Sequence, residues 1–156
     1  GNISSYMHPN GTLFVGGTDR GWGARGGRRF ALDRVTWKGK VPFEIHEMRA
    51  KPDGFELTFT HEVEAVSAGN LASYSMSAYT YIYRSDYGSP VVDKLTPKIV
   101  GVEVTGPKTV RVTVDKLIHG HIHELHAKSV RSAKGLPILH PVGYYTLNEI
   151  PPGDLN

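Results

Sequence analysis

Apolar and polar residues alternate along most of the chain after residue 42, and this period of two predicts β-strands. The clearest run is GFELTFT at residues 54–60, which places Phe55, Leu57 and Phe59 on one face. A strand with one buried side is expected to show this pattern. The run before it, FEIHEMRA at 43–50, is joined to it by KPDG, a sequence typical of tight turns. The two runs therefore predict a hairpin. In the first strand the alternation sets one group of residues, Phe43, Ile45 and Glu47, against another, Glu44, His46 and Met48.

Further strands are predicted where β-branched and aromatic residues recur between turn signals. These lie at residues 74–84, 98–105, 109–114, 121–130 and 143–147. Residues 63–74, rich in Ala, Ser and Asn, favour a helical turn instead. About seven short strands at this spacing predict an all-β fold, an Ig-like β-sandwich.

The chain before residue 43 has a different pattern. TLFVGG at residues 12–17 and FALDRVTW at 30–37 predict two strands around a Gly/Arg-rich loop, and KGKVP at 38–42 resembles a linker. We therefore expect a two-strand segment over residues 1–42, a sandwich over 43–150 and a Pro/Gly-rich tail over 151–156.

The loop contains GWGARGG, which matches the G-x-G-x-x-G fingerprint of dinucleotide-binding proteins. That fingerprint requires a helix directly after it, inside a βαβ unit. Here the helix would occupy residues 28–37, which have no apolar stripe of helical period, and the later chain alternates with period two. The match is therefore interpreted as accidental.

Charge and composition exclude several classes of protein. The chain has 18 Lys and Arg against 15 Asp and Glu, a net charge of +3, and its basic residues are mostly scattered. Nucleic-acid binding needs a denser basic stripe. No apolar run is long enough to predict a membrane span.

The absence of cysteine excludes disulfides, thiolate metal sites and cysteine nucleophiles in this chain. Because the chain starts at Gly1 rather than Met, we expect it to be part of a longer protein.

The run HGHIHELH supplies a candidate metal site, formed by His119, His121 and His123. Residues two apart on a strand share a face at about 7 Å, so these imidazoles are candidates to hold Zn or Cu. The alternative is an exposed turn followed by a histidine at the sandwich edge, without metal. The pattern places no carboxylate on that face, because Glu124 points the other way.

Tyrosines supply a second candidate site. Tyr79, Tyr81 and Tyr83, together with Tyr87, follow the period of two, so they are expected to share a face. Tyrosine rings with polar rims stack on sugar rings, which favours carbohydrate as a ligand. The alternative is that the rings only pack against other parts of the protein.

Arginines in the glycine-rich loop form a third candidate site. Arg25 and Arg28 could bind an anionic ligand or an acidic partner domain, or simply lie in solvent. Nothing in the sequence predicts catalysis: Glu44 and Glu47 lack the context of an acid/base pair, and there is no nucleophile elbow. We expect this chain not to be an enzyme.

Two stretches, FELTFTHEVEAVSAGNLASYSM and IVGVEVTGPKTVRVTVDKLIHGHIHELHAKSVRSAKGLPI, resemble the bacterial Ig-like module of S-layer and other exported proteins. His123 departs from the family, which usually has an aromatic residue there. The resemblance implies a sandwich and says little about chemistry. The matching residues are Phe59, Val63, Asn70, Tyr74, Leu117, Gly120, Val130, Ser132, Gly135 and Ile138.

The stretches NGTLFVGGTDRGWGARGG and AYTYIYRSDYGSPVVD resemble the C-terminal region of exported, planctomycete-type sorbosone/glucose-dehydrogenase-like proteins. Those proteins combine a β-propeller with c-type haem-binding modules. The resemblance implies that residues 10–37 are the last strands of a propeller, and that haem c or a quinone belongs to the parent protein and not to this chain. It also implies export to the periplasm or cell surface. The expected function is a non-catalytic structural domain that contacts other domains of the same polypeptide. The alternative is a carbohydrate- or metal-binding module that uses the tyrosines or residues 119–126.

Overall fold

The computed structural model describes residues 2–19 and 27–153. The chain divides into two compact units, Gly1–Val41 and Pro42–Asn156. Nearly all regular structure is β, which confirms the predicted fold class, and among the described residues no helix is long and apolar enough to cross a membrane. The strands are β1 (Asn2–Met7), β2 (Leu13–Thr18), β3 (Phe30–Val35), β4 (Ile45–Lys51), β5 (Gly54–Phe59), β6 (Ser75–Tyr81), β7 (Val91–Leu95), β8 (Ile99–Gly106), β9 (Thr109–Val114), β10 (His121–His126) and β11 (Val142–Leu147).

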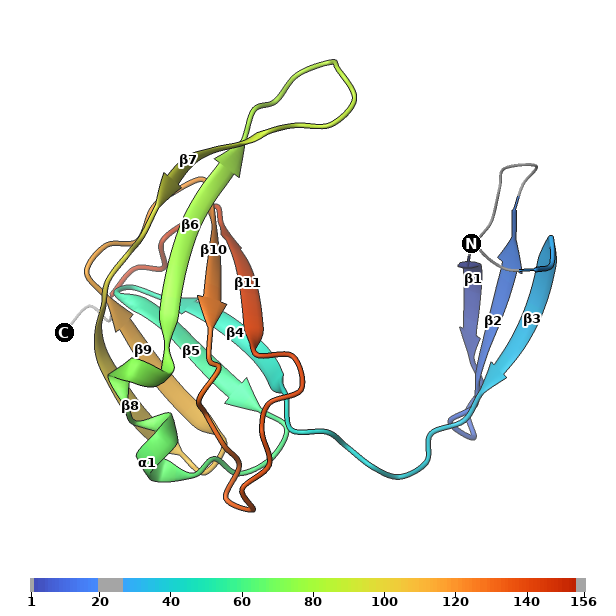
Figure 1. Cartoon of the computed structure of the whole chain (residues 1–156), viewed down its shortest axis with the longest axis horizontal. Helices are drawn as coiled ribbons and strands as arrows, with labels where there is room; N and C mark the ends of the chain where they lie inside the picture. Colours follow the sequence, from blue (N-terminus) through green and yellow to red (C-terminus); the bar gives the residue numbers. More distant parts are fainter. Residues whose placement is uncertain (1, 20–26, 154–156) are drawn as a thin grey trace. The chain divides into compact units, whose positions relative to one another are not determined.

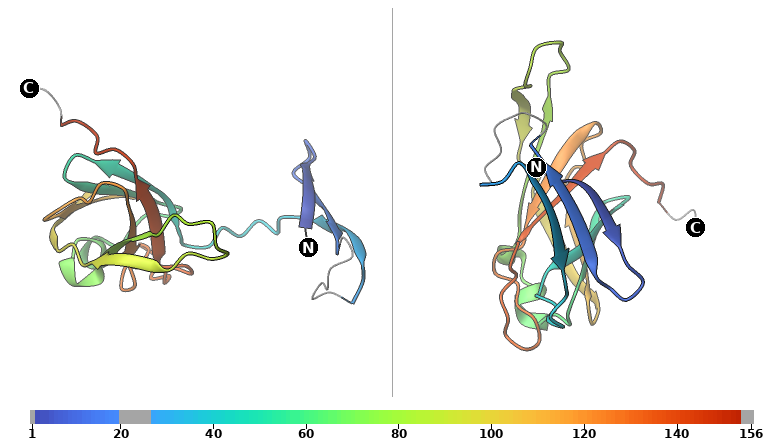
Figure 2. Two further views of the ribbon diagram at one scale, coloured as in Figure 1. Left: turned by 90° about the horizontal axis from the view of Figure 1, so that it is seen from above. Right: turned by 90° about the vertical axis from the view of Figure 1, so that its right-hand side faces the viewer.

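The second unit is a sandwich of two antiparallel four-stranded sheets, in the orders β11-β10-β6-β7 and β4-β5-β9-β8. The sheets face each other across one core (Figures 1 and 2). Phe55, Leu57 and Phe59 on β5 are all at most 1 % exposed, as their alternation predicts. Val110 and Val112 on the neighbouring β9 are equally buried beside them. Burying large apolar side chains from both sheets is the main source of stability in such a fold.

Strand β4 departs from the predicted alternation. Its register against β5 shifts between Ile45 and Glu47, so that Met48 pairs with Leu57. As a result Ile45 and Met48 both pack against the core, whereas simple alternation placed Glu47 on the same face as Ile45. A bulge of this kind adds one residue to a strand and turns the following side chains over.

The predicted helical turn is present between β5 and β6, as α1 (Ala65–Ala68) and a 3₁₀ turn, η1 (Leu71–Ser73). The carboxylate of Glu64 caps α1 by accepting hydrogen bonds from two backbone N–H groups, at 3.0 and 2.7 Å. After the 3₁₀ turn, the buried hydroxyl of Tyr74 donates to the Ala68 carbonyl at 2.7 Å. These contacts fix the entry into β6.

The sandwich has eight strands rather than about seven, because β7 forms an extra edge strand beside β6. The predicted strand over residues 74–84 ends at Tyr81, and residues 82–90 form a loop that projects from the sandwich (Figure 1). Pairing of β6 with β7 is irregular between Ala78 and Thr80. Asp93 on β7 has a φ of 52°, a left-handed backbone conformation that is uncommon outside glycine.

The first unit is a three-stranded antiparallel sheet in the order β1-β2-β3. The sequence predicted two strands there, and β1 was missed because NISSYM is largely polar. Apolar side chains of this first unit are poorly covered: on β3 and just after it, Phe30, Leu32 and Trp37 are 78 %, 77 % and 72 % exposed.

Candidate functional site

Strand β10 directs His123 into the sandwich core. The ring is fully buried and lies 5.3 Å from the ring of Phe55, measured between centroids. Its Nε2 accepts a hydrogen bond from the backbone N–H of Ile118 at 3.3 Å, while Nδ1 is buried without a hydrogen-bond partner. Burial lowers the pKa of His123, because a charged imidazole would lose its hydration there. His123 is therefore a neutral core residue.

His121 points inward beside it, but its ring nitrogens are held by two separate oxygens. Nδ1 lies 3.0 Å from the carbonyl oxygen of His119, and Nε2 lies 2.9 Å from a carboxylate oxygen of Asp93 on β7. The sequence placed no carboxylate at this face, because β7 was not recognised. Among the residues that the structure describes, no three His, Cys, Asp or Glu side chains are arranged to hold a metal ion. The structure thus does not bring the predicted zinc or copper ligands together.

The tyrosines do not form one stripe. Tyr79 and Tyr81 lie on the outer face of β6, with ring centroids 5.8 Å apart in an edge-to-face arrangement. Tyr83 and Tyr87 lie in the projecting loop beyond the strand and are fully exposed. The expectation of a shared face fails because β6 ends at Tyr81, so the period of two no longer applies.

The predicted arginine site is divided between described and undescribed residues. Arg28 is exposed just before β3, and Arg25 lies outside the described residues, as does the G-x-G-x-x-G match. The neighbouring Arg29 pairs with Asp19 at 3.0 Å, closing the base of this loop.

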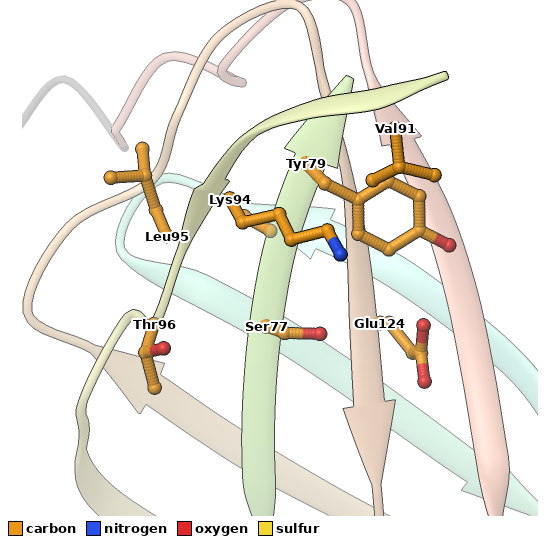
Figure 3. Close-up of a pocket in the computed structure, with 8 residues that line it drawn as sticks. Ser77, Tyr79, Val91, Lys94, Leu95, Thr96 and Glu124 are labelled. Carbon is orange, nitrogen blue, oxygen red and sulfur yellow. The ribbon is translucent and has the colours of Figure 1, made fainter. Parts of the chain in front are cut away.

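A pocket of about 420 Å³ lies on the outer face of the sheet formed by β6, β7 and β10 (Figure 3). Tyr79 is the one residue of the predicted sites that lines it. The remaining lining residues are Ser77, Ala78, Val91, Lys94, Leu95, Thr96 and Glu124. Tyr79 and Glu124 come together because both point outward from strands β6 and β10, which are paired; the alternation gives their outward direction, but the sequence did not predict that these strands are neighbours. The wall from β7 was missed because that strand was not predicted.

A positive charge on Lys94, a negative charge on Glu124 and the aromatic ring of Tyr79 meet in this pocket. Burial, followed by the negative charge of Glu124, raises the pKa of Tyr79 to about 12. Glu124 also contacts Nε2 of His126 at 2.8 Å. The Lys94 side chain extends toward the side of the pocket that holds Tyr79 and Glu124 (Figure 3). Within the described part of the chain, the Lys94 ammonium has no carboxylate within ion-pair distance. The ammonium of Lys94 can donate hydrogen bonds to a polar ligand, and the carboxylate of Glu124 can accept them.

No family model and no curated protein matches the chain. Among solved structures, it is similar to domains 1–6 of the surface layer protein SbsC, with a TM-score of 0.54 at 17% identity, covering 74% of this chain and 15% of that one. It is also similar to the N-terminal part of the bacterial S-layer protein SbsC, with a TM-score of 0.52 at 16% identity, covering 69% of this chain and 24% of that one. The chain thus spans less than a quarter of the proteins it resembles. At these identities the similarity establishes a shared fold: the chain has the β-sandwich architecture found in a bacterial S-layer protein.

Proposed function

We propose that this chain is a non-catalytic structural module of an exported or cell-surface protein, and that it contacts other domains of the same polypeptide. The observation that carries the proposal is the eight-stranded sandwich, whose fold is shared with part of an S-layer protein. A sandwich with its own closed core is suited to act as a rigid spacer between neighbouring domains.

Charged residues that could suggest catalysis have structural partners instead. Both carboxylate oxygens of Glu44 contact His140, one at the backbone N–H at 2.8 Å and one at Nδ1 at 2.6 Å. This clamp joins the start of β4 to the connection that leads into β11. Glu47 pairs with Arg49 on the same strand at 2.8 Å. The contacts of Glu44 support a role for this carboxylate in holding two segments of the sandwich together, whereas the pair of Glu47 and Arg49 lies within a single strand.

The proposed parent protein is a β-propeller dehydrogenase-like protein that carries haem c, and this finer step rests on the sequence resemblance. The sequential order β1-β2-β3 of the first unit is compatible with part of a propeller blade. The exposed Phe30 and Leu32 further support a sheet that requires a neighbouring sheet to cover it. Two measurements on the full-length native protein test this step. Its absorption spectrum should show c-type haem bands, and its full sequence should contain propeller repeats. A protein with neither would refute the step.

Protease accessibility tests the location of the protein. Cells of the source organism would be treated with trypsin while intact, after permeabilisation of any outer membrane, and after lysis. We expect peptides that end at Arg84, in the projecting loop, in one of the first two samples, while a cytoplasmic marker protein stays uncut. Cleavage that requires full lysis would overturn the proposal.

A further inference from the structure

We propose that the pocket on the outer face of β6, β7 and β10 binds a saccharide, with the Tyr79 ring as its stacking surface. This goes beyond a structural role, because it gives the sandwich a ligand of its own. At about 420 Å³, the pocket lies within the range of roughly 300–1,000 Å³ typical of small-ligand sites.

The polar groups around the ring are available to a ligand. Among the described residues, neither the hydroxyl of Ser77 nor that of Thr96 has a protein hydrogen-bond partner, and the Lys94 ammonium has no ion-pair partner. Exposed polar groups of this kind form hydrogen bonds with water when no ligand is bound, and ligand hydroxyls can replace those hydrogen bonds at little cost. Glu124 lies on the same side of the pocket as Tyr79 (Figure 3); one of its carboxylate oxygens contacts His126 at 2.8 Å, and the other supplies an acceptor.

The combination of charges selects the class of ligand. Lys94 would attract an anion that Glu124 repels, and Glu124 would attract a cation that Lys94 repels, so neither kind of charged ligand is strongly favoured. A neutral ring bearing several hydroxyl groups satisfies both residues, because each hydroxyl donates to a carboxylate as well as accepting from an ammonium. The flat face and polar rim of a tyrosine match the apolar face and polar edge of such a ring.

The fold holds the pocket walls in place. Tyr79 and Glu124 stand on the paired strands β6 and β10. Lys94 stands on the edge strand β7, next to Asp93, whose carboxylate contacts the buried His121 at 2.9 Å. Binding sites built on strands are positioned more accurately than sites on loops. The contact between His121 and Asp93 thus ties the backbone next to Lys94 to β10, the strand that carries Glu124.

The test is a titration of the full 156-residue chain, followed by ¹⁵N-¹H NMR, with two neutral probes, cellotetraose and chitotetraose. We expect saturable shifts at the amides of Ser77, Lys94 and Thr96 with at least one probe. Tyr79→Ala and Glu124→Gln should each weaken binding on the order of tenfold. Tyr87→Ala, which removes a fully exposed ring outside the pocket, is the matched control and should bind like the wild type.

Three outcomes would overturn the proposal. They are the absence of saturable shifts with both probes, binding that Tyr79→Ala leaves unchanged, and preferential binding of a zwitterion such as free glycine. If Tyr79→Ala fails to fold, Glu124→Gln decides the question, since it keeps the volume of the side chain and removes the charge; unchanged binding in that variant would then overturn the proposal. These outcomes are independent of the protease experiment, so the saccharide site and the location of the protein are tested separately.

Discussion

Replacing Gly54 by alanine should strongly destabilise the sandwich, because β5 and β9 approach each other closely at this position. A Cβ at residue 54 would overlap the carbonyl oxygen of Val112 and lie 3.0 Å from the Cα of Thr113. Both obstacles are backbone atoms of a paired central strand, so relief requires moving β9 rather than rotating a side chain. Gly101→Ala is a matched control: residue 101 also pairs with Thr113, but from the other side, and its Cβ would meet the Thr113 Cβ at 3.4 Å.

Overpacking of a protein interior costs roughly 1–3 kcal/mol, and a backbone obstacle belongs at the upper end of that range. Reduced entropy of the unfolded chain returns about 0.4–1 kcal/mol in each variant. We therefore expect Gly54→Ala to lower the free energy of unfolding by at least about 2 kcal/mol, and Gly101→Ala to change it by less than about 1 kcal/mol. Urea unfolding followed by circular dichroism measures both values. Equal midpoints for the two variants would refute the close approach of β5 to β9.

Three further predictions concern the core and its surroundings. Tyr74→Phe removes the buried hydrogen bond to Ala68 and should cost about 1 kcal/mol in urea unfolding; an unchanged midpoint would contradict that bond. Leu57→Ala, at a fully buried site, should cost about 2–5 kcal/mol, whereas Tyr87→Ala should stay within about 0.5 kcal/mol, and a reversed order would show that the core is misplaced. Burial lowers the pKa of His123, so only the unfolded chain gains its proton as the pH drops below about 6.5; stability should be full above that pH and decline below it. His123→Phe should reduce this decline in thermal melts across pH, and an identical pH dependence in the variant would argue against a buried neutral ring.

The strands of the sandwich were predictable where alternation was regular. Phe55, Leu57 and Phe59 define the core face of β5 from sequence alone, and the structure agrees. The edge strand β7 was not predictable in the same way, since VVDKL is short and lacks regular alternation. Its formation depends on pairing with β6 across a long loop, which is a non-local contact that sequence patterns do not encode.

The histidines show why the candidate site was harder to predict than the fold. A period of two correctly assigns His121 and His123 to one face, but it does not say whether that face meets solvent or the core. Leu125, two residues further on, is fully buried on the same face and was the signal that the histidines point inward. The pocket requires a residue from β7, so it could be recognised only after that strand was known.

The irregular edge strand has a consequence for the behaviour of the protein at high local concentration. Unpaired N–H and C=O groups along a sheet edge can recruit a strand from a neighbouring molecule, which is a common start of aggregation. In β7 the register shift opposite Ala78 and Thr80 and the left-handed conformation of Asp93 interrupt that row of groups within five residues. The same irregularity that hid β7 in the sequence thus discourages edge-to-edge pairing of sheets between copies of the chain.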